Sequence, residues 1–281
     1  MLDDASFVKV LGSALNVSKQ TTEQSCTRGQ REGSLFLLKN CLSGLTLFRI
    51  FNPTDFSEFP QVGPSFKVND FPTAYVIIRT MFETYINMYY VLIEPKREAE
   101  KEHRLDLWEC HGYAQTLIMG KTFGLQDDAL KVTEGNYRQI KKKIISSDFY
   151  KSLSKKKKES IKADEWNPNV NKVALAIRSG FHPTQARFFY KFLSNYAHSE
   201  RYSLMQMGEV KSPQHSEGLL NSFPKTFAEM LLALTVNAFA KMYSPAMDLI
   251  AKDEELLKIL NGWEKAKRKD FTKWDDELVK Y

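Results

Sequence analysis

One short segment, YKFLSNYAHSERY, carries side chains whose types and spacing could do chemistry. Tyr190, Ser194 and His198 recur at every fourth position, so a helix would place them one above another on one face. Histidine titrates near neutral pH and serves as a general acid or base, while Tyr and Ser supply hydrogen-bond donors and acceptors. Because the rest of the segment is apolar and aromatic, we expect these polar groups to find partners elsewhere in the fold.

A second apolar segment offers matching charges. Arg79 and Glu83 stand one helical turn apart in the run TAYVIIRTMFETYINMYYVLI. Two buried helices with polar rows indicate a shared network, so we expect Arg79, Glu83, Ser194 and His198 to converge, with Tyr190 in support. A histidine oriented by a carboxylate and accompanied by an arginine can perform metal-independent acid–base chemistry on a phosphodiester. The alternative is a structural network that fixes helix register, and the residues alone leave both open.

The two segments together resemble an uncharacterised family of prokaryotic helical proteins, domain-of-unknown-function 5677. Its members pair an Arg-x-x-x-Glu helix with a later Tyr-x-x-x-Ser-x-x-x-His helix, and the resemblance covers about residues 73–199. It implies an all-α fold and a looser similarity to HEPN helical domains. Many of those are ribonucleases, or inactive relatives of ribonucleases, in toxin–antitoxin and phage-defence systems. Function must still be argued from the site itself.

The HEPN ribonuclease motif is an arginine followed after four to six residues by a histidine. His198 has no arginine at that spacing. Arg97 with His103, and Arg104 with His111, do fit it. Chance alone produces such spacings readily in a chain of this composition, so these two pairs are secondary candidates for a ribonuclease site.

Composition and periodicity favour helices throughout. The chain of 281 residues holds only 13 Gly and 10 Pro, which disfavours an all-β fold with its many turns. We predict an all-α single domain spanning 1–281, a multi-helix bundle with a HEPN-like antiparallel core, interrupted by an irregular Pro-rich connection at about 52–72. Predicted helices open at Ser34, follow a cap at Asp70, and cover about 224–243.

The apolar run after Asp70 is long enough to cross a bilayer. Arg79 and Glu83 at its centre would each cost about 2.5–3.5 kcal/mol there, so we predict a core helix buried on all sides and no membrane contact.

Three cysteines without a C-x-x-C pair, and an N-terminus without a secretory pattern, predict a cytoplasmic protein. The sequence contains no G-x-G-x-x-G, Walker A or H-E-x-x-H motif, so we expect no cofactor and no metal.

The positive charge is concentrated in one segment. Residues 138–162 hold ten Lys or Arg against two acidic residues, a net charge of +8 within a total of +6. A basic segment of this kind is either simply solvated or contacts phosphate groups of nucleic acid. The residues that we expect to contact phosphate are Lys141, Lys142, Lys143, Lys155, Lys156, Lys157 and Lys158.

The C-terminal segment has apolar residues at spacings of three, four and three: Phe271, Trp274, Leu278 and Tyr281. This amphipathic stripe predicts a contact with a protein partner or with the protein itself. For the whole chain we expect a cytoplasmic prokaryotic protein that binds nucleic acid in defence or stress. The alternatives are a metal-independent HEPN-type ribonuclease and a structural or scaffolding protein.

Overall fold

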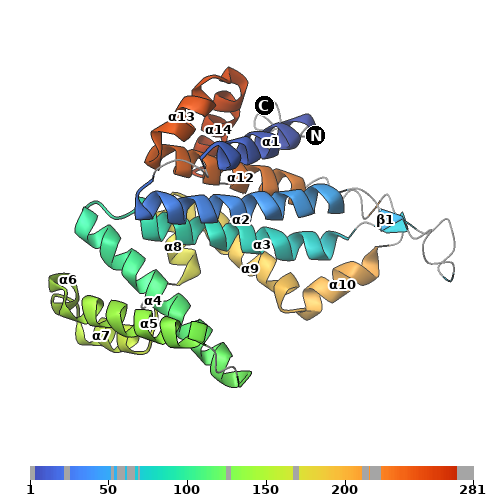
Figure 1. Ribbon diagram of the computed structural model, residues 1–281. Coiled ribbons are helices and arrows are strands. Elements are labelled where there is room, and N and C mark those ends of the chain that lie inside the picture. The colour runs from blue at the N-terminus through green and yellow to red at the C-terminus, as the bar shows by residue number, and fades with distance from the viewer. Residues whose placement is uncertain are drawn as a thin grey trace. The chain divides into compact units, whose positions relative to one another are not determined.

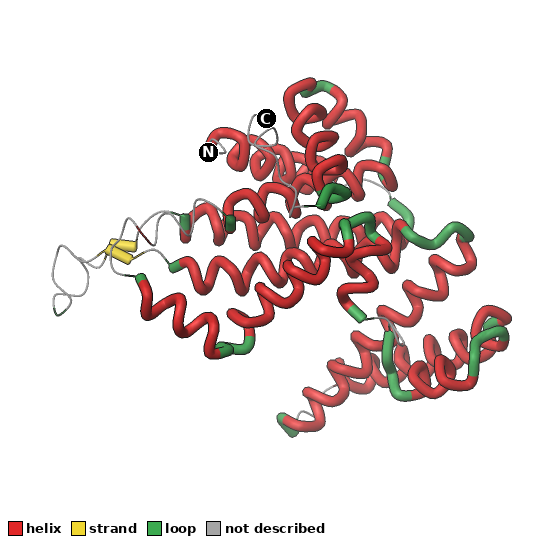
Figure 2. The backbone as a smooth tube through the Cα atoms, turned by 180° about the vertical axis from the view of Figure 1, so that it is seen from behind, coloured by secondary structure: helices red, strands yellow, loops and turns green. Residues whose placement is uncertain are grey.

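The computed structural model describes residues 4–21, 26–51, 54–55, 61, 67–68, 70–124, 128–166, 171–210, 215 and 223–270. The prediction of an all-α fold is confirmed, because helices make up nearly all of this part of the chain (Figure 2). The described strands are two short ones, β1 (Thr54–Asp55) and β2 (Lys67–Val68), which pair antiparallel inside the predicted Pro-rich connection. The HEPN-like core stays a prediction.

The internal contacts divide the chain into two compact units, and a single domain over 1–281 stays a prediction. Unit 1 comprises Met1–Met88 with Lys172–Tyr281, and unit 2 comprises Tyr89–Asn171. The described helices of unit 1 are α1 (Asp4–Thr21), α2 (Arg28–Ile50), α3 (Phe71–Met88), α8 (Lys172–Arg178), α9 (Pro183–Ala197), α10 (Arg201–Glu209), α12 (Pro224–Met242), α13 (Ser244–Ala251) and α14 (Glu254–Ala266). Those of unit 2 are a π-helix η1 (Tyr89–Ile93), α4 (Glu98–Thr122), α5 (Asp128–Ser146), α6 (Asp148–Lys151) and α7 (Lys155–Lys162).

The core of unit 1 forms around α12, which was predicted to span about 224–243. Phe227, Leu231 and Leu234 are buried, and α12 contacts α1, α2, α3, α13 and α14. A polar contact joins two helices inside this core, where the Asn40 amide nitrogen of α2 donates to the Thr235 hydroxyl of α12 at 2.8 Å. Because a buried amide without a partner is costly, this bond favours one register of α2 on α12.

Helix α2 begins at Arg28 and not at Ser34, so its predicted start is wrong. Thr27 is the cap: its hydroxyl accepts the backbone N–H of Gln30, and the Gln30 side chain accepts the N–H of Thr27 at 2.8 Å. This reciprocal pair is a capping box, and it satisfies two backbone donors that a helix start would otherwise leave open.

Helix α3 starts as predicted, since the Asp70 carboxylate accepts the backbone N–H of Thr73 at 3.2 Å. It runs back antiparallel to α2 (Figure 1) and also contacts α9, α8 and α12. The prediction that α3 is buried on all sides is wrong, because Val76 is 38% exposed and Thr80 is exposed as well. Within the described part of the chain, we find no helix with the length and apolar character needed to cross a membrane.

Helix α9 is amphipathic and not buried all round. It begins at Pro183 and buries Phe189 and Leu193 against the core, where the Phe189 ring meets Phe227 edge-on at 3.9 Å between centroids. Phe188 on the opposite face is 48% exposed. The polar row that the sequence placed inside the protein therefore lies at the border between core and solvent.

Unit 2 packs α4 against α5, α6 contacts both of these helices, and α7 is bonded to α5. Two aromatic rings support it, Trp108 and Trp166, in edge-on contact at 4.6 Å between centroids. The buried Asp106 of α4 pairs with Lys143 of α5 at 2.8 Å. Charge pairing therefore holds the two long helices together alongside apolar contacts.

A buried carboxylate joins three helices of unit 1. Glu229 of α12 is 2% exposed and accepts hydrogen bonds from the Ser6 hydroxyl of α1 at 2.8 Å and the Trp263 indole of α14 at 2.9 Å. Burial raises the pKa of Glu229, while the two donors partly offset this shift. The ionised form is therefore disfavoured in the folded protein.

A carboxyl group with a raised pKa gives stability that is complete below its unfolded pKa of about 4.3 and is lost as the pH rises through the folded value. Glu229→Gln removes this titration. Denaturant unfolding from pH 4 to pH 8 should show wild type losing stability relative to the variant as the pH rises. Glu254→Gln, at an exposed position of α14, is the matched control. Parallel curves for wild type and Glu229→Gln would contradict this assignment.

Candidate functional site

The candidate site of unit 1 is built around Arg79, which α3 directs toward α9. The Arg79 Nε–H donates to the Glu83 carboxylate at 3.1 Å, and Nη2 lies 3.0 Å from the same oxygen. Nη1 donates to the Ser194 hydroxyl of α9. The expected convergence of Arg79, Glu83 and Ser194 is therefore present, and it links two helices more than a hundred residues apart in the sequence.

Tyr190 completes the surroundings of the guanidinium. Its ring lies under Arg79 with the guanidinium carbon 4.7 Å from the ring centroid, a cation–π contact. The Ser194 hydroxyl, which accepts from Arg79, donates in turn to the Tyr190 carbonyl. Both roles of the hydroxyl are thus occupied, so Ser194 has no free proton to exchange with a ligand.

The polar face of α3 extends one turn further to Asn87. Its amide oxygen accepts from Lys172 of α8 at 3.0 Å, and burial lowers the pKa of Lys172. A pocket of about 200 Å³ lies beside this face. Its lining residues are Lys39, Val76, Arg79, Thr80, Glu83, Thr84, Asn87 and Ala197. This volume is below the roughly 300–1,000 Å³ of typical small-molecule sites, so it suits one polar group.

His198 does not join the network. Helix α9 ends at Ala197, and His198 follows as an exposed residue that forms no side-chain hydrogen bond with any other described residue. Glu83 pairs with Arg79 and forms no hydrogen bond with His198 among the described residues, so an orienting role for Glu83 stays a prediction. The geometry therefore brings together a charged structural cluster and leaves its proposed general base outside.

The two secondary histidines lie in unit 2. His103 is 5% exposed, its ring packs on Phe149 at 4.6 Å between centroids, and burial lowers its pKa to about 4. A buried, uncharged ring cannot meet a phosphodiester, so the pairing of Arg97 with His103 is unsuitable. His111 is half-buried, and its Nδ1 lies 2.7 Å from the backbone oxygen of Asp164. That contact fits a ring whose other nitrogen remains available.

Arg104, the partner of His111 by spacing, is fully engaged. Its guanidinium pairs with the carboxylates of Glu94 and Glu100, donates to the carbonyl oxygen of Tyr90, and lies 4.1 Å from the Tyr90 ring centroid. These contacts hold the π-helix against α4. Arg104 therefore acts in folding, because its guanidinium is used by contacts within the protein.

The basic segment contains lysines of two kinds. Lys141 and Lys143 are paired with Asp164 and Asp106, and Lys158 donates to the carbonyl oxygen of Lys151 at 2.7 Å. The other four predicted phosphate contacts are exposed and form no ion pair with a described residue: Lys142, Lys155, Lys156 and Lys157. These four exposed lysines are therefore the ones whose charge remains available to a ligand.

Asp164 forms several of the contacts that hold α7 on α5 in the basic segment. It adopts a left-handed backbone conformation, with φ of 63°, which is uncommon for a residue with a side chain. Its carboxylate accepts from the Tyr137 hydroxyl at 3.1 Å and from Lys141, which also donates to the Ile161 carbonyl at 2.8 Å. These contacts close the end of α7 onto α5. No local sequence pattern predicts these contacts, because the paired residues are 20 to 27 positions apart.

Within the described ranges, no group of three or more His, Cys, Asp or Glu side chains is placed to hold a metal ion. The C-terminal stripe, Phe271, Trp274, Leu278 and Tyr281, lies outside the described residues.

Lys39 and Lys172 lie beside the Arg79 cluster, and the sequence analysis did not predict either of them as a site residue. A lysine in an amphipathic helix carries no sign of which neighbour it meets.

Comparison with known proteins gives one result. A family model described as a family of unknown function, DUF5677, matches residues 66–215, just over half of the chain. The match includes α3 and α9, which carry Arg79 and Ser194, and the whole basic segment. No curated protein and no solved structure matches the chain.

The partial exposure of Arg79 and Glu83 limits how much free energy of unfolding is lost when their ion pair is removed. The Arg79 side chain is 12% exposed and that of Glu83 is 30% exposed, so the loss of 3–5 kcal/mol known for fully buried pairs is an upper bound. We expect Glu83→Ala to lower the free energy of unfolding by about 1–2 kcal/mol. Chemical denaturation measures this loss. An exposed i,i+4 pair, cut by Glu134→Ala, is the control and should change little. Equal values for the two variants would contradict a structural role for the cluster.

Proposed function

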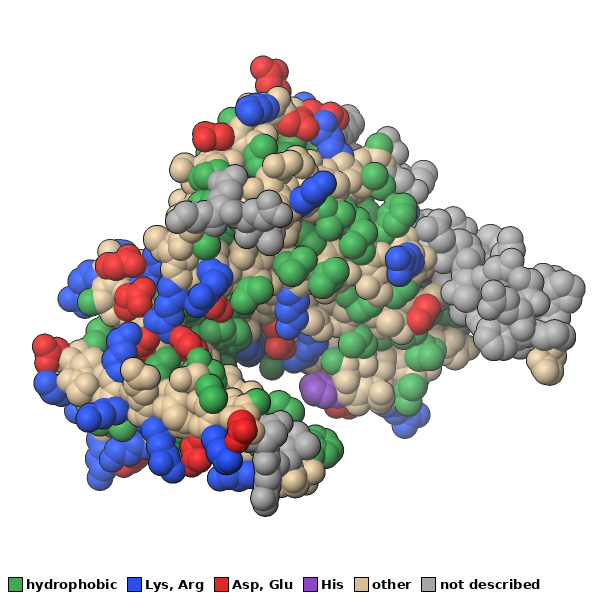
Figure 3. Space-filling model, in the orientation of Figure 1, with side chains coloured by type: hydrophobic (Ala, Val, Ile, Leu, Met, Phe, Trp, Pro, Cys, Tyr) green, Lys and Arg blue, Asp and Glu red, His purple; other side chains and the backbone are tan. Residues whose placement is uncertain are grey.

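The chain belongs to the DUF5677 family of unknown function, and we propose that it binds the phosphate backbone of nucleic acid through the basic segment of unit 2. One observation carries the proposal: Lys142, Lys155, Lys156 and Lys157 are exposed and have no ion-pair partner among the described residues. In Figure 3, Lys and Arg side chains gather along the side of this unit that α5 and α7 form. Like charges held together in this way repel one another, and a polyanion would relieve the repulsion.

The N-terminus of α7 adds to the positive electrostatic potential of the basic segment. Ser154 caps the helix, and Lys155, Lys156 and Lys157 fill its first turn, with no acidic residue among them. Cations at a helix N-terminus oppose the helix dipole, whereas an anion there is favourable. A phosphate group near this turn would therefore meet both the lysines and the dipole. This arrangement is poor for the stability of α7 and favourable for phosphate binding.

The aromatic residues of the segment favour backbone contact over base stacking. Tyr137 donates to Asp164, Phe149 packs on His103, and Tyr150 is buried. All three rings are buried or half-buried, so they are poorly placed for the base stacking that single-strand binding proteins commonly use. We therefore expect binding that depends on charge and salt but little on base sequence.

The finer parts of the proposal rest on the resemblance of the chain to helical proteins of prokaryotic defence. They are a HEPN-like antiparallel core, a cytoplasmic location, and a role in phage defence or stress. A structural or scaffolding role is the alternative for unit 1, and it is supported by the saturated contacts of Arg79 and Ser194.

A second candidate function is a metal-independent ribonuclease. The contact between His111 Nδ1 and the Asp164 backbone oxygen favours it, because a carbonyl partner fixes the ring and leaves Nε2 for proton transfer. Arg79, Glu83 and His198 remain the other proposed catalytic set, although His198 lacks an orienting contact.

The binding proposal predicts the effect of replacing Lys155, Lys156 and Lys157 with Gln. Affinity for a labelled single-stranded RNA should fall for all sequences alike. The slope of log K against log salt should flatten by about 2, since each lost contact removes about 0.7. Fluorescence anisotropy at several salt concentrations measures both quantities.

The matched control removes the same charge from unit 1, at the exposed residues Lys19, Lys252 and Lys265. This control should bind as wild type does. If both triple variants lose affinity equally, net charge explains the binding, and the basic segment has no specific part in it.

The ribonuclease proposal predicts that purified protein degrades single-stranded RNA in the presence of EDTA, and that one histidine is needed. Loss of activity in His111→Ala with activity kept in His198→Ala would assign the reaction to unit 2, and the reverse result would assign it to the Arg79 cluster. Wild-type protein without activity would remove the ribonuclease proposal and leave the binding proposal untouched.

A further inference from the structure

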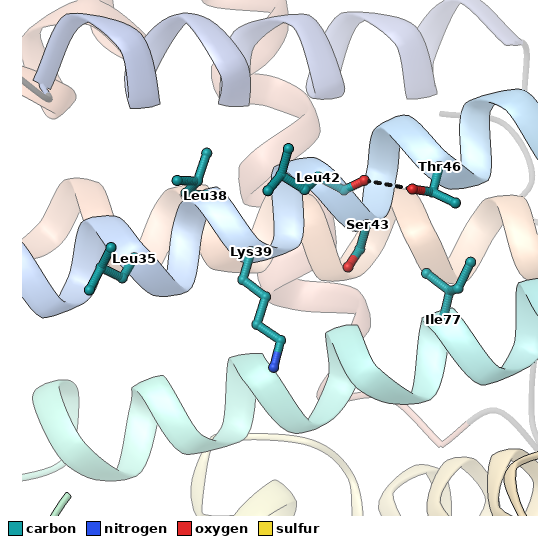
Figure 4. A pocket seen from close by; sticks show the side chains of 7 residues that line it. All are labelled: Leu35, Leu38, Lys39, Leu42, Ser43, Thr46 and Ile77. Atoms are coloured by element: carbon teal, nitrogen blue, oxygen red, sulfur yellow. Dashed lines mark hydrogen bonds between the residues drawn. The ribbon is translucent and has the colours of Figure 1, made fainter. Parts of the chain in front are cut away.

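Helix α2 presents an apolar stripe that the core does not use. Leu35, Leu38 and Leu42 are 55%, 41% and 54% exposed, although α2 already packs on α1, α3 and α12 with its other faces. In Figure 4 these leucines line an open groove of about 420 Å³, with Ile77 of α3 on its other wall. Figure 3 shows apolar side chains gathered over α2 on this face. Contiguous exposed apolar surface of this kind marks a contact with another element.

The same groove has a positively charged side. Lys39 projects from α2 toward α3 (Figure 4) and lines both the apolar groove and the adjoining polar pocket of Arg79 and Asn87. Lys39 is exposed and forms no ion pair with any residue that the structure describes. Glu83, the carboxylate of the pocket, is already paired with Arg79. An occupant that covers the leucines would therefore gain from carrying a carboxylate.

One segment of this chain has that chemistry. The sequence FTKWDDELVKY, residues 271–281, lies outside the described residues. Phe271, Trp274 and Leu278 are spaced by three and four, as are Leu35, Leu38 and Leu42 on α2. Three consecutive acidic residues, 275–277, stand between Trp274 and Leu278. Apolar and charged groups thus match those of the groove in type and in spacing.

The position of the last described residues favours a segment from another copy of the chain. Lys267 donates to the Tyr85 hydroxyl of α3 at 3.0 Å, and Asp270 follows three residues later. Tyr85 is 1% exposed on the core side of α3, whereas Leu35 and Leu42 of the groove lie on the exposed face of α2. A segment from the same chain would therefore have to leave the core side of α3 and pass around the helix to reach the groove. A second copy meets the groove without this detour.

We propose that the groove of Leu35, Leu38, Leu42 and Ile77 binds residues 271–281 of a second copy of this chain, with Lys39 meeting the acidic residues. Each copy supplies one groove and one segment, so two copies exchange segments around a two-fold axis. The proposal goes beyond nucleic-acid binding, which involves unit 2, and neither depends on the other.

The first test is the mass of the full-length protein by analytical ultracentrifugation over a range of concentrations. Wild type should form dimers, and Leu42→Glu should be monomeric. Leu204→Glu on α10 is the matched control, because Leu204 is 55% exposed and lies outside the groove. Wild type that is monomeric throughout overturns the proposal, as does a dimer that Leu42→Glu leaves intact.

The second test is a charge reversal across the contact. Lys39→Glu should raise the dissociation constant of the dimer about tenfold, because each of its two grooves loses one charge pair. Adding Asp275→Lys and Asp276→Lys to that variant should restore it. Circular dichroism confirms that each variant is folded. A Lys39→Glu variant that dimerises as wild type does, or one that the added lysines leave unrescued, would show that the acidic segment does not occupy the groove.

Discussion

The pairing of Lys141 with Asp164 is the contact on which the basic surface depends. It closes the end of α7 onto α5, and Tyr137 and the Asp164 backbone contact with His111 hold the same residue in its left-handed conformation. Without this closure, α7 with its exposed lysines would not be held on α5, which carries Lys142. Unit 2 therefore uses part of its positive charge for folding and leaves the rest exposed.

Unit 1 uses its charges differently. Arg79 is saturated by Glu83, Ser194 and Tyr190, so it fixes α9 on α3 and has little capacity left for catalysis. Buried polar contacts of this kind restrict a bundle to one register, as the bond between Asn40 and Thr235 does for α2 on α12. Beside this site Lys39 forms no ion pair with a described residue, and it also lines the groove on the surface of α2.

The sequence predicted the positions of helices better than the tertiary contacts of their side chains. Periodicity located α12, and Asp70 marked the start of α3, because both signals are local. The start of α2 was misplaced because the capping box at Thr27 was overlooked. His198 was placed on the polar row because the row was extended past Ala197, where the helix ends. The pairing of Lys141 with Asp164 depends on tertiary contacts, and no local pattern reports those.

The central claim is that nucleic acid binds on the surface of α5 to α7. Amide hydrogen exchange of the full-length protein, measured with and without a saturating single-stranded RNA at low salt, tests it most directly. The account predicts slower exchange in residues 128–162 on RNA binding, and no change along α3 and α9. Protection confined to α3 and α9, or no protection anywhere despite bound RNA, would contradict it.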